Sequence, residues 1–227
     1  MRCYHSMMIR YKTAQDWLSR QLNDPYVKKS RYHNYRARSA FKLLEMDEKY
    51  NLLRPGMTVI DCGAAPGSWT QVLVPKVNAD RRCEDHPVGK VISIDVVPFE
   101  PVPHANCYGE VDFLDDDSVK RVLEDLGAGW SLSCDLVVSD MAPNASGVAA
   151  IDHEKITVLS YAALVFALKT LKPGGGFICK LWHGSRTPEL KADLKTHFNH
   201  VHIVKPDASR GDSAEIFFVA ERFRGVK

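Results

Sequence analysis

The sequence lacks any long run of apolar residues. None of its 227 residues lies in a stretch that approaches the ~18 consecutive apolar positions of a membrane-spanning helix. The first ten residues, MRCYHSMMIR, also lack the apolar core of a secretory signal. Acidic residues are absent before Asp16, which is typical of a short mitochondrial presequence or its remnant. A frayed basic tail has the same composition, so we predict that residues 1–30 form an N-terminal extension and leave both interpretations open.

Cysteine is sparse and scattered. The six residues are Cys3, Cys62, Cys83, Cys107, Cys134 and Cys179. Those at 62, 134 and 179 lie in or beside apolar runs, which predicts buried free thiols in a reducing compartment rather than a disulfide framework. Cys83 and His86 have C-x-x-H spacing, but no second pair of ligands follows nearby, so we predict no metal site. Net charge is only +2, and any basic surface must therefore be local.

The remaining composition is that of an ordinary α/β protein, with 45% hydrophobic and 26% charged residues. Strands are predicted at 57–62, 91–97, 134–140, 176–182, 201–205 and 215–220, and helices at 36–50, 68–77, 118–126, 155–171 and 188–198. Strands separated by helices at this spacing predict right-handed βαβ units, a mostly parallel central sheet and helices on both faces. The link at 206–214 is too short for a crossover helix, so the last two strands should form an antiparallel hairpin.

A run of small residues follows the first predicted strand: Asp61-Cys62-Gly63-Ala64-Ala65-Pro66-Gly67-Ser68-Trp69. In a doubly wound sheet, the first strand-to-helix turn is where a nucleotide-like ligand binds. The run is neither G-x-G-x-x-G nor a Walker loop, and Pro66 removes a backbone N–H. These departures disfavour a pyrophosphate cradle and favour a neutral or cationic cofactor, whose ammonium Asp61 could attract. A tight structural turn is the alternative interpretation.

Charged residues stand at the ends of the next predicted strands. Asp95 could hold ribose hydroxyls, and Asp112 could accept a hydrogen bond from an exocyclic amine. Asp140 and Lys180 close the third and fourth strands. A lysine that ends an apolar strand is costly unless something requires it, although a lysine whose amine reaches the surface is the common alternative. We therefore predict a ligand crevice at this edge of the sheet.

The segment 28–42 contains six Lys and Arg residues and no acid, with Tyr32, His33 and Tyr35 interleaved. Cations offer phosphate contacts and rings offer base stacking, so the pattern predicts RNA binding. The proposed RNA contacts are Lys28, Lys29, Arg31, Arg36 and Arg38. A solvated basic helix start is the alternative interpretation.

Five motifs now stand in order: R-x-R-S-A-F-K-L-L-E, D-C-G-A-A-P-G-S-W, S-D-M-A-P-N, K-P-G-G-x-F-x-x-K and K-P-x-x-S-R…E. Together they resemble the FtsJ/RrmJ family of ribose 2′-O-methyltransferases, from about residue 14 to 222. The resemblance implies a Rossmann-like fold that uses S-adenosyl-L-methionine, as one domain over 31–227 with a basic RNA-binding N-terminal helix. It implies a catalytic tetrad of Lys42, Asp140, Lys180 and Glu215. The implied cofactor positions are Asp61, Gly63, Ala64, Ala65, Pro66, Gly67, Ser68, Trp69, Asp95, Asp112 and Asp140.

Details within the motifs bear on the substrate. The form S-D-M-A-P-N-A-S-G looks like the large-subunit rRNA branch, whereas tRNA-modifying relatives usually have D-G-A-P-D at 140–144. Residues 17–31 and the insertion at 78–89 are similar to mitochondrial members of that branch. The resemblance therefore implies a monomeric enzyme of the mitochondrial matrix. Its substrate would be a uridine near the peptidyl transferase centre, in large-subunit rRNA or a pre-ribosomal large subunit.

Four other functions stay open on the sequence. The tRNA ribose 2′-O-methyltransferase of the same family is the nearest, and a non-enzymatic ribosome-assembly factor is the second. A messenger-cap 2′-O-methyltransferase generally needs further modules, for which 227 residues leave little room. A nicotinamide-dependent dehydrogenase is disfavoured because G-x-G-x-x-G is missing and a basic arm is present.

Overall fold

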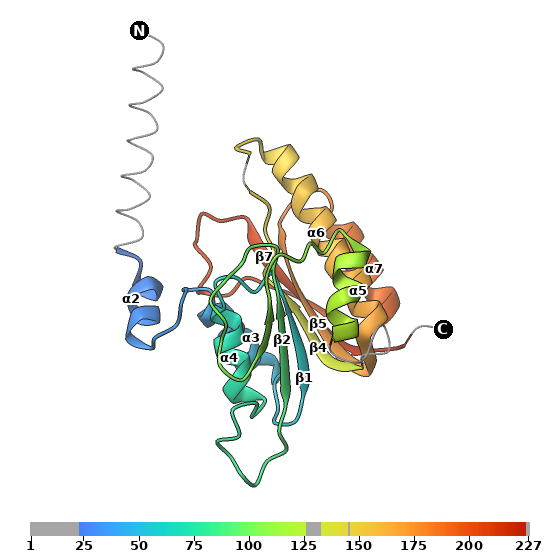
Figure 1. The fold of residues 1–227 in the computed structure, drawn as a ribbon. Helices are drawn as coiled ribbons and strands as arrows, with labels where there is room; N and C mark the ends of the chain where they lie inside the picture. Colours follow the sequence, from blue (N-terminus) through green and yellow to red (C-terminus); the bar gives the residue numbers. More distant parts are fainter. Residues whose placement is uncertain (1–22, 126–132, 145, 226–227) are drawn as a thin grey trace.

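The computed structural model describes residues 23–125, 133–144 and 146–225. Its centre is a seven-stranded sheet with the order β3-β2-β1-β4-β5-β7-β6 (Figure 1). The strands are β1 (Thr58–Cys62), β2 (Lys90–Ile94), β3 (Asn106–Tyr108), β4 (Cys134–Ser139), β5 (Leu171–Trp182), β6 (Phe198–Val204) and β7 (Glu215–Phe223). The pairs from β3 to β5 are parallel, and β7 is antiparallel to both β5 and β6. The predicted mostly parallel sheet with an antiparallel C-terminal pair is confirmed.

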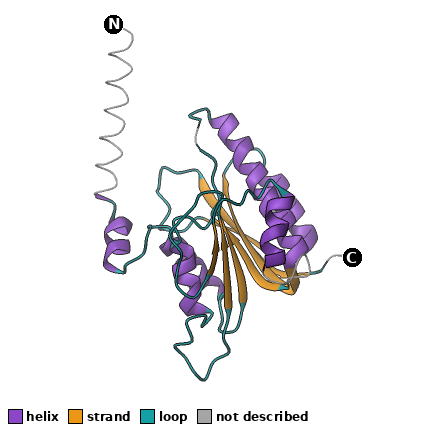
Figure 2. Cartoon of the chain, viewed as in Figure 1, coloured by secondary structure: helices purple, strands orange, loops and turns teal. Residues whose placement is uncertain are grey.

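Helices cover both faces of the sheet, as predicted. They are α2 (Pro25–Tyr32), α3 (Ala40–Tyr50), α4 (Ser68–Lys76), α5 (Asp116–Asp125), α6 (Ala149–Thr170) and α7 (Thr187–His197). Figures 1 and 2 show α3 and α4 on one face and α5, α6 and α7 on the other, with α2 outside the α3 layer. The molecule is therefore a three-layer α/β/α structure.

Two apolar layers follow from the alternation of side chains along each strand. Val138 and Ile178 face α3 and α4, where they pack in one core with Leu43. Cys179 and Phe218 face the other way, into the core beneath α5, α6 and α7. The thiols of Cys62, Cys134 and Cys179 are free and buried, as predicted, and burial raises the pKa of Cys134 to about 12.

The N-terminal basic segment differs from its prediction. A separate helix, α2, precedes α3, and α3 begins at Ala40 rather than near residue 36. The carboxylate of Asp24 starts α2 by accepting the N–H groups of Tyr26 at 2.9 Å and Val27 at 3.4 Å, and Pro25 occupies the first turn. The predicted boundary between the N-terminal extension and the methyltransferase domain, after residue 30, thus falls inside α2. The predicted presequence falls mostly on residues 1–22, which lie outside the described residues.

Two strands also differ from prediction. The three-residue β3 was not predicted, because so short an edge strand carries little alternation. The sequence predicts that Lys172-Pro173-Gly174 forms a turn that ends α6. In the structure, these residues already belong to β5, which begins at Leu171. In the described residues, no helix is long and apolar enough to cross a membrane.

One buried carboxylate joins α3 to its neighbours. Asp47 Oδ1 accepts the backbone N–H groups of Leu52 at 3.1 Å and Leu53 at 2.8 Å. Its Oδ2 lies 2.6 Å from Lys76 Nζ at the end of α4. Asp47 is 5% exposed, so both the loop after α3 and the α3–α4 contact depend on a desolvated charge.

We expect Asp47→Ala to lower the free energy of unfolding by about 2–4 kcal/mol, because it leaves two buried N–H groups and an ammonium without a partner. Urea unfolding followed by circular dichroism measures this change. The exposed Glu48→Ala on the same helix is the control and should change stability by less than about 0.5 kcal/mol. Equal effects from both substitutions would contradict the assigned role.

Candidate active site

The polar residues of the site lie in one row across the carboxyl edge of the sheet. Asp61 of β1 is in register with Val138 of β4, which is in register with Ile178 of β5. Two residues after these three positions come Gly63, Asp140 and Lys180. Because side chains alternate with period two, this second row faces the same way as the first, toward α3 and α4.

Lys180 and Asp140 form a nearly buried ion pair. The ammonium of Lys180 lies 2.9 Å from Asp140 Oδ1 and donates a hydrogen bond to the Asp140 carbonyl at 2.6 Å. Lys180 is 7% exposed. Ser160 of α6 donates to the Lys180 carbonyl at 2.8 Å and so fixes the backbone beneath the amine. Apart from the ion pair, the buried Asp140 Oδ1 has no partner among the described residues.

A second ion pair stands beside the first. Lys42 Nζ on α3 lies 2.7 Å from Glu215 Oε1 at the start of β7, and Ser209 Oγ donates to the same oxygen at 2.8 Å. Phe217 connects the two pairs: it is in register with Lys180, and the Lys42 ammonium lies 5.5 Å from its ring centroid. The structure thus brings all four predicted tetrad residues to one face of the sheet.

A pocket of about 630 Å³ opens on one side of this row. Three carboxylates, those of Asp95, Asp112 and Asp140, line it together with apolar side chains. Its full lining is Gly63, Ala65, Asp95, Val96, Val97, Val111, Asp112, Phe113, Leu114, Asp140, Met141, Ala142, Pro143, Asn144, Lys155, Val158 and Leu159. Apolar walls with a few carboxylates suit a ligand that combines apolar surface with hydrogen-bond donors or positive charge.

Two of these carboxylates are oriented by backbone N–H groups. Asp95 Oδ2 accepts the N–H of Ala65 and Oδ1 that of Val97, both at 2.8 Å. Asp112 Oδ1 accepts the N–H of Leu114 at 2.9 Å. A carboxylate oxygen has a further lone pair, so each can still accept a hydroxyl or amine of a ligand.

Glycine is required at two points of the turn. Gly63 has φ +78°, and a Cβ there would lie 2.5 Å from the Met141 side chain. Gly67 has φ +104°, and a Cβ there would lie 2.7 Å from Arg36 Nη1. Side chains at either position would therefore clash as well as strain the backbone.

The other predicted residues of the turn do not line this pocket. Ser68 and Trp69 point to α3 instead: Ser68 Oγ is 2.7 Å from Ser39 Oγ, and Trp69 Nε1 donates to the Ser39 carbonyl at 2.8 Å. Ala64, Pro66 and Gly67 are also missing from the lining. The structure therefore assigns Ser68 and Trp69 to helix packing, and direct contact with the pocket to Gly63 and Ala65.

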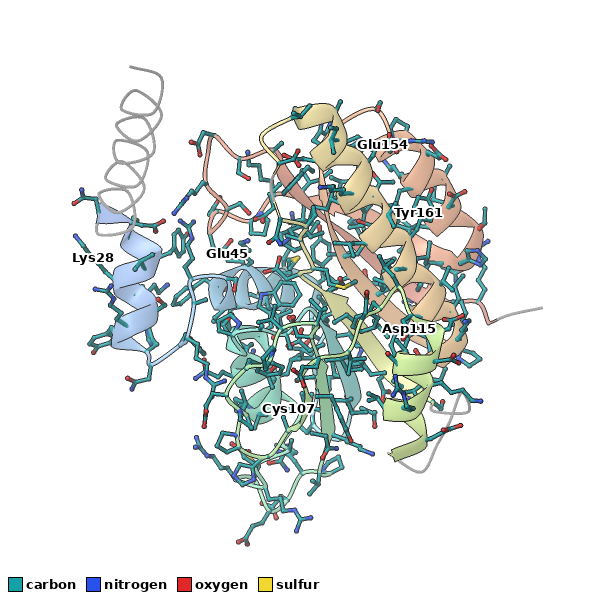
Figure 3. The ribbon with its side chains drawn as sticks, turned by 45° about the horizontal axis from the view of Figure 1, so that its top comes forward. Lys28, Glu45, Cys107, Asp115, Glu154 and Tyr161 are labelled. Atoms are coloured by element: carbon teal, nitrogen blue, oxygen red, sulfur yellow. The ribbon has the colours of Figure 1, made fainter. Side chains whose placement is uncertain are left out.

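The predicted RNA-binding residues divide into two groups. Lys28, Lys29 and Arg31 are exposed on α2, where Figure 3 shows Lys28 at the edge of the molecule. The Arg36 guanidinium instead donates to the carbonyls of Pro66 at 2.8 Å, Pro101 at 2.9 Å and Glu100, and so braces the turn.

Lys42 and Glu215 line a separate hollow of about 230 Å³. Asp140 of the first ion pair thus lines the pocket, whereas Lys42 and Glu215 of the second line the hollow. Sequence reasoning gave no role to Ser209, which orients Glu215. Its signal was present in the K-P-x-x-S-R motif.

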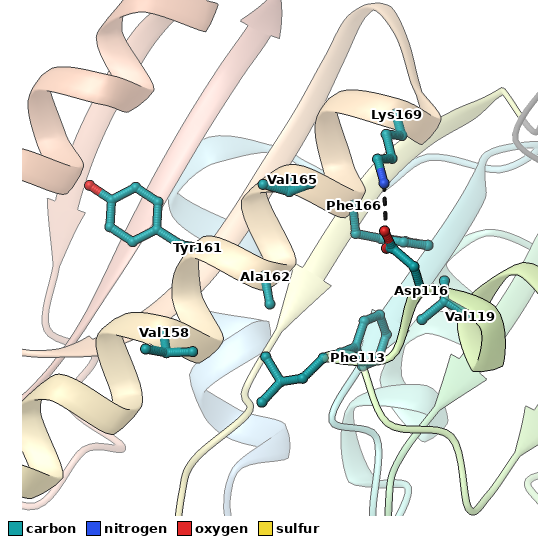
Figure 4. A pocket seen from close by; sticks show the side chains of 10 residues that line it. Phe113, Asp116, Val119, Val158, Tyr161, Ala162, Val165, Phe166 and Lys169 are labelled. Atoms are coloured by element: carbon teal, nitrogen blue, oxygen red, sulfur yellow. Dashed lines mark hydrogen bonds and ion pairs between the residues drawn. The ribbon is translucent and has the colours of Figure 1, made fainter.

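A third pocket, of about 320 Å³, lies between α5 and α6 (Figure 4). Its walls are mostly apolar, and its charged residues, Asp116 and Lys169, lie 3.4 Å apart as an ion pair at the rim. It lacks the facing carboxylates of the first pocket. No group of three potential metal ligands occurs within the described ranges.

Asp61 lies beneath the turn rather than in the pocket wall. It is fully buried, Thr70 Oγ1 donates to its Oδ2 at 2.8 Å, and its Oδ1 has no partner among the described residues. Burial raises the pKa of Asp61 to about 7; the Thr70 hydrogen bond opposes this shift, and the charges of Asp140 and Asp95 add to it. An orphaned acid beside two others fits a site that receives a cation.

Because the folded pKa of Asp61 lies above its unfolded value, the folded state holds the proton more tightly. Its stabilising contribution is complete below about pH 4 and is lost as pH rises through about 7. We expect wild type to lose roughly 1–2 kcal/mol of stability from this group between pH 6 and pH 8, and Asp61→Asn to lose none. Urea unfolding at both pH values tests this. Identical pH slopes for the two proteins would refute it.

Comparison with known proteins finds similar sequences and a similar structure among rRNA methyltransferases. The chain is 51% identical over 217 residues to "rRNA methyltransferase 2, mitochondrial" of Drosophila melanogaster, covering 96% of this chain and 86% of that protein. It is 44% identical over 216 residues to "Ribosomal RNA large subunit methyltransferase E" of Xanthobacter autotrophicus, covering 95% and 81%. A crystal structure of a protein described as a ribosomal RNA methyltransferase of Plasmodium falciparum matches with a TM-score of 0.67 and 31% identity, over 85% of this chain and 100% of that one.

The family model described as FtsJ-like methyltransferase matches residues 35–223. That range contains the pocket, the hollow and both ion pairs. It also bears out the family resemblance drawn from the motifs. The chain belongs to the FtsJ-like methyltransferase family.

Proposed function

We propose that this protein methylates the ribose 2′-hydroxyl of a uridine in large-subunit rRNA, near the peptidyl transferase centre, with S-adenosyl-L-methionine as methyl donor. The observation that carries the proposal is the two neighbouring ion pairs, one lining the hollow and the other contributing Asp140 to the pocket. The names of the two similar proteins support rRNA as substrate, and the Drosophila name supports a mitochondrial location. Within the mitochondrion, we propose the matrix. The protein acts as a monomer, on the RNA itself or on a pre-ribosomal large subunit.

Membership of a methyltransferase family implies S-adenosylmethionine, which supplies a methyl group on a positively charged sulfonium. Asp95 would hold the ribose hydroxyls and Asp112 the base amine, with the apolar walls around the base. Asp140, at the inner end of the pocket, would face the cationic methionine end. A bound cation would favour the ionised form of Asp61, whose pKa burial raises to about 7, and that carboxylate would then add negative charge from beneath. Gly63 and Ala65 would allow close approach. Ala64, Pro66 and Gly67 would act by shaping the turn.

Lys180 would accept the proton of the 2′-hydroxyl after its ammonium has released one proton to solvent, and the transfer would restore the ammonium beside Asp140. Asp140, which lines the pocket, holds the Lys180 amine through both a carboxylate and a carbonyl. A neutral amine has the free lone pair that this role requires. Holding hydroxyl and methyl in line would contribute roughly 7–11 kcal/mol, and the general base a further ~10²–10⁴-fold.

Lys42 and Glu215 would hold the acceptor ribose in the hollow. Their side chains are each about nine-tenths buried, and Ser209 fixes the carboxylate. An ammonium and a carboxylate side by side can donate to one sugar oxygen and accept from another. These contacts would orient the ribose so that its 2′-hydroxyl faces Lys180.

Further RNA contacts would lie on α2. Lys28, Lys29 and Arg31 are exposed there, and Tyr32 is 84% exposed at the end of the same helix. An exposed ring beside cations suits base stacking with phosphate contacts. We therefore extend the proposed methyltransferase domain to include all of α2 rather than to begin at residue 31.

We expect Lys180→Ala to reduce methyl transfer by at least about 10²-fold, because no other base replaces the amine. Lys180→Arg should fail as well, since a guanidinium stays protonated. Cofactor affinity, measured by calorimetry, should stay within a few-fold of wild type for Lys180→Ala. The exposed Lys195→Ala on α7 serves as the control and should be fully active. If Lys180→Ala lost cofactor affinity and turnover to the same extent, the role of Lys180 would be structural.

We expect tritium from methyl-labelled S-adenosylmethionine to enter a ribose of large-subunit rRNA or of immature large subunits, and not tRNA. Both RNAs are incubated with wild type and Lys180→Ala, and the labelled nucleotide is identified after nuclease digestion. If only tRNA were labelled, the protein would instead be a tRNA ribose 2′-O-methyltransferase of the same family. If cofactor binds but no RNA is labelled, the protein is an assembly factor instead.

A further inference from the structure

The carbonyl oxygen of Ser39 accepts two hydrogen bonds at the point where α3 begins. One donor is the backbone N–H of Lys42 at 3.0 Å, in the first turn of that helix. The other is the indole Nε1 of Trp69 at 2.8 Å, in the first turn of α4. Trp69 is 2% exposed, so its ring is shielded from water. One oxygen thus joins the backbone of Lys42 to a side chain that follows the turn of small residues.

Further hydrogen bonds fasten the chain ahead of α3 to the same turn of α4. Ser39 Oγ lies 2.7 Å from Ser68 Oγ. The side-chain amide of Gln71 donates to the Asn34 carbonyl at 2.9 Å and accepts the N–H of Arg36 at 2.8 Å. Figure 1 shows α3 and α4 together on one face of the sheet. Because α4 begins directly after the turn of small residues, these bonds fix the start of α3 relative to that turn.

The Trp69 ring also constrains Lys42 through an aromatic neighbour. The ring centroids of Trp69 and Phe217 lie 5.8 Å apart, and the Lys42 ammonium lies 5.5 Å from the Phe217 centroid. The same ammonium pairs with Glu215 at 2.7 Å. The indole therefore acts on Lys42 in two ways, on its backbone through Ser39 and on its side chain through Phe217.

We propose that Trp69 is a positioning residue for methyl transfer. Its indole sets the place of α3 relative to the turn, and so the place of Lys42 relative to a ligand in the pocket that Trp69 itself does not line. The inference rests on the proposed function, in which Lys42 holds the acceptor ribose. A misplacement of about 1 Å can cost on the order of 10²-fold in rate, so a small shift of α3 matters.

The test is Trp69→Phe, which keeps an aromatic ring in the core and removes the indole N–H. We expect the single-turnover rate of methyl transfer, at saturating cofactor and with the RNA that wild type methylates, to fall about tenfold. Affinity for S-adenosylhomocysteine, measured by calorimetry, should stay within about twofold of wild type. Ser39→Ala removes only the hydroxyl contact with Ser68 and should lower the rate about threefold, the scale of one neutral hydrogen bond.

Lys76→Gln is the matched control, because it removes the contact with Asp47 that joins the same two helices at their other ends. It should lower the melting temperature, as Trp69→Phe does, while the rate of methyl transfer stays at the wild-type value. Equal losses of rate in Lys76→Gln and Trp69→Phe would make Trp69 a packing residue only. Weaker S-adenosylhomocysteine binding with a wild-type rate at saturation would assign the ring to the cofactor. Either result would overturn the proposal.

Amide hydrogen exchange provides a readout that needs no activity. We expect the first turn of α3, including the Lys42 N–H, to exchange faster in Trp69→Phe than in wild type, with protection in β5 unchanged. Unchanged exchange in that turn would overturn the inference. If wild type methylates no RNA while this protection depends on Trp69, the proposed function alone is rejected. If wild type is active and Trp69→Phe transfers methyl at the full rate, the positioning role alone is rejected.

Discussion

The site depends on the ion pair between Lys180 and Asp140, because both charges stand at the edge of an otherwise apolar sheet. Removing an ammonium and a carboxylate from water costs several kcal/mol each, and close contacts between the two groups must offset this cost. Lys180 makes two such contacts with Asp140: its Nζ lies 2.9 Å from the carboxylate Oδ1 and 2.6 Å from the backbone carbonyl oxygen. The strands on either side must keep their register for both contacts to exist, so the local chemistry and the sheet topology are coupled.

Sheet topology also decides why the residues of the pocket and the hollow lie at the same edge of the sheet. The parallel strands β1, β2 and β4 end beside one another and deliver Gly63, Asp95 and Asp140 to the same edge. The antiparallel β7 enters next to β5 from the opposite direction, which places Glu215 beside the end of β5. A further parallel strand at this position would instead have begun at the far edge. The antiparallel pair thus supplies the second half of the tetrad.

Charge near the site is arranged in two opposite ways. The pocket side carries acids, with Asp61 buried beneath them and its pKa raised to about 7. The hollow side carries Arg38, Lys42 and Arg210. A cation on one side and a polyanion on the other would each meet complementary charge. This separation of charge would keep two oppositely charged ligands in distinct places.

The sequence by itself determined the fold class and the turn of small residues, because strand alternation and short motifs are local properties. The four tetrad positions came from the family resemblance that the motifs carry. It also indicated a basic segment ahead of the sheet. Only the tertiary structure decided that Trp69 turns to α3, that Arg36 braces the turn, and that Asp24 joins Arg38 to Arg210. Those outcomes depend on contacts between residues far apart in the chain. No local periodicity encodes such contacts, since loop paths and helix packing bring the partners together.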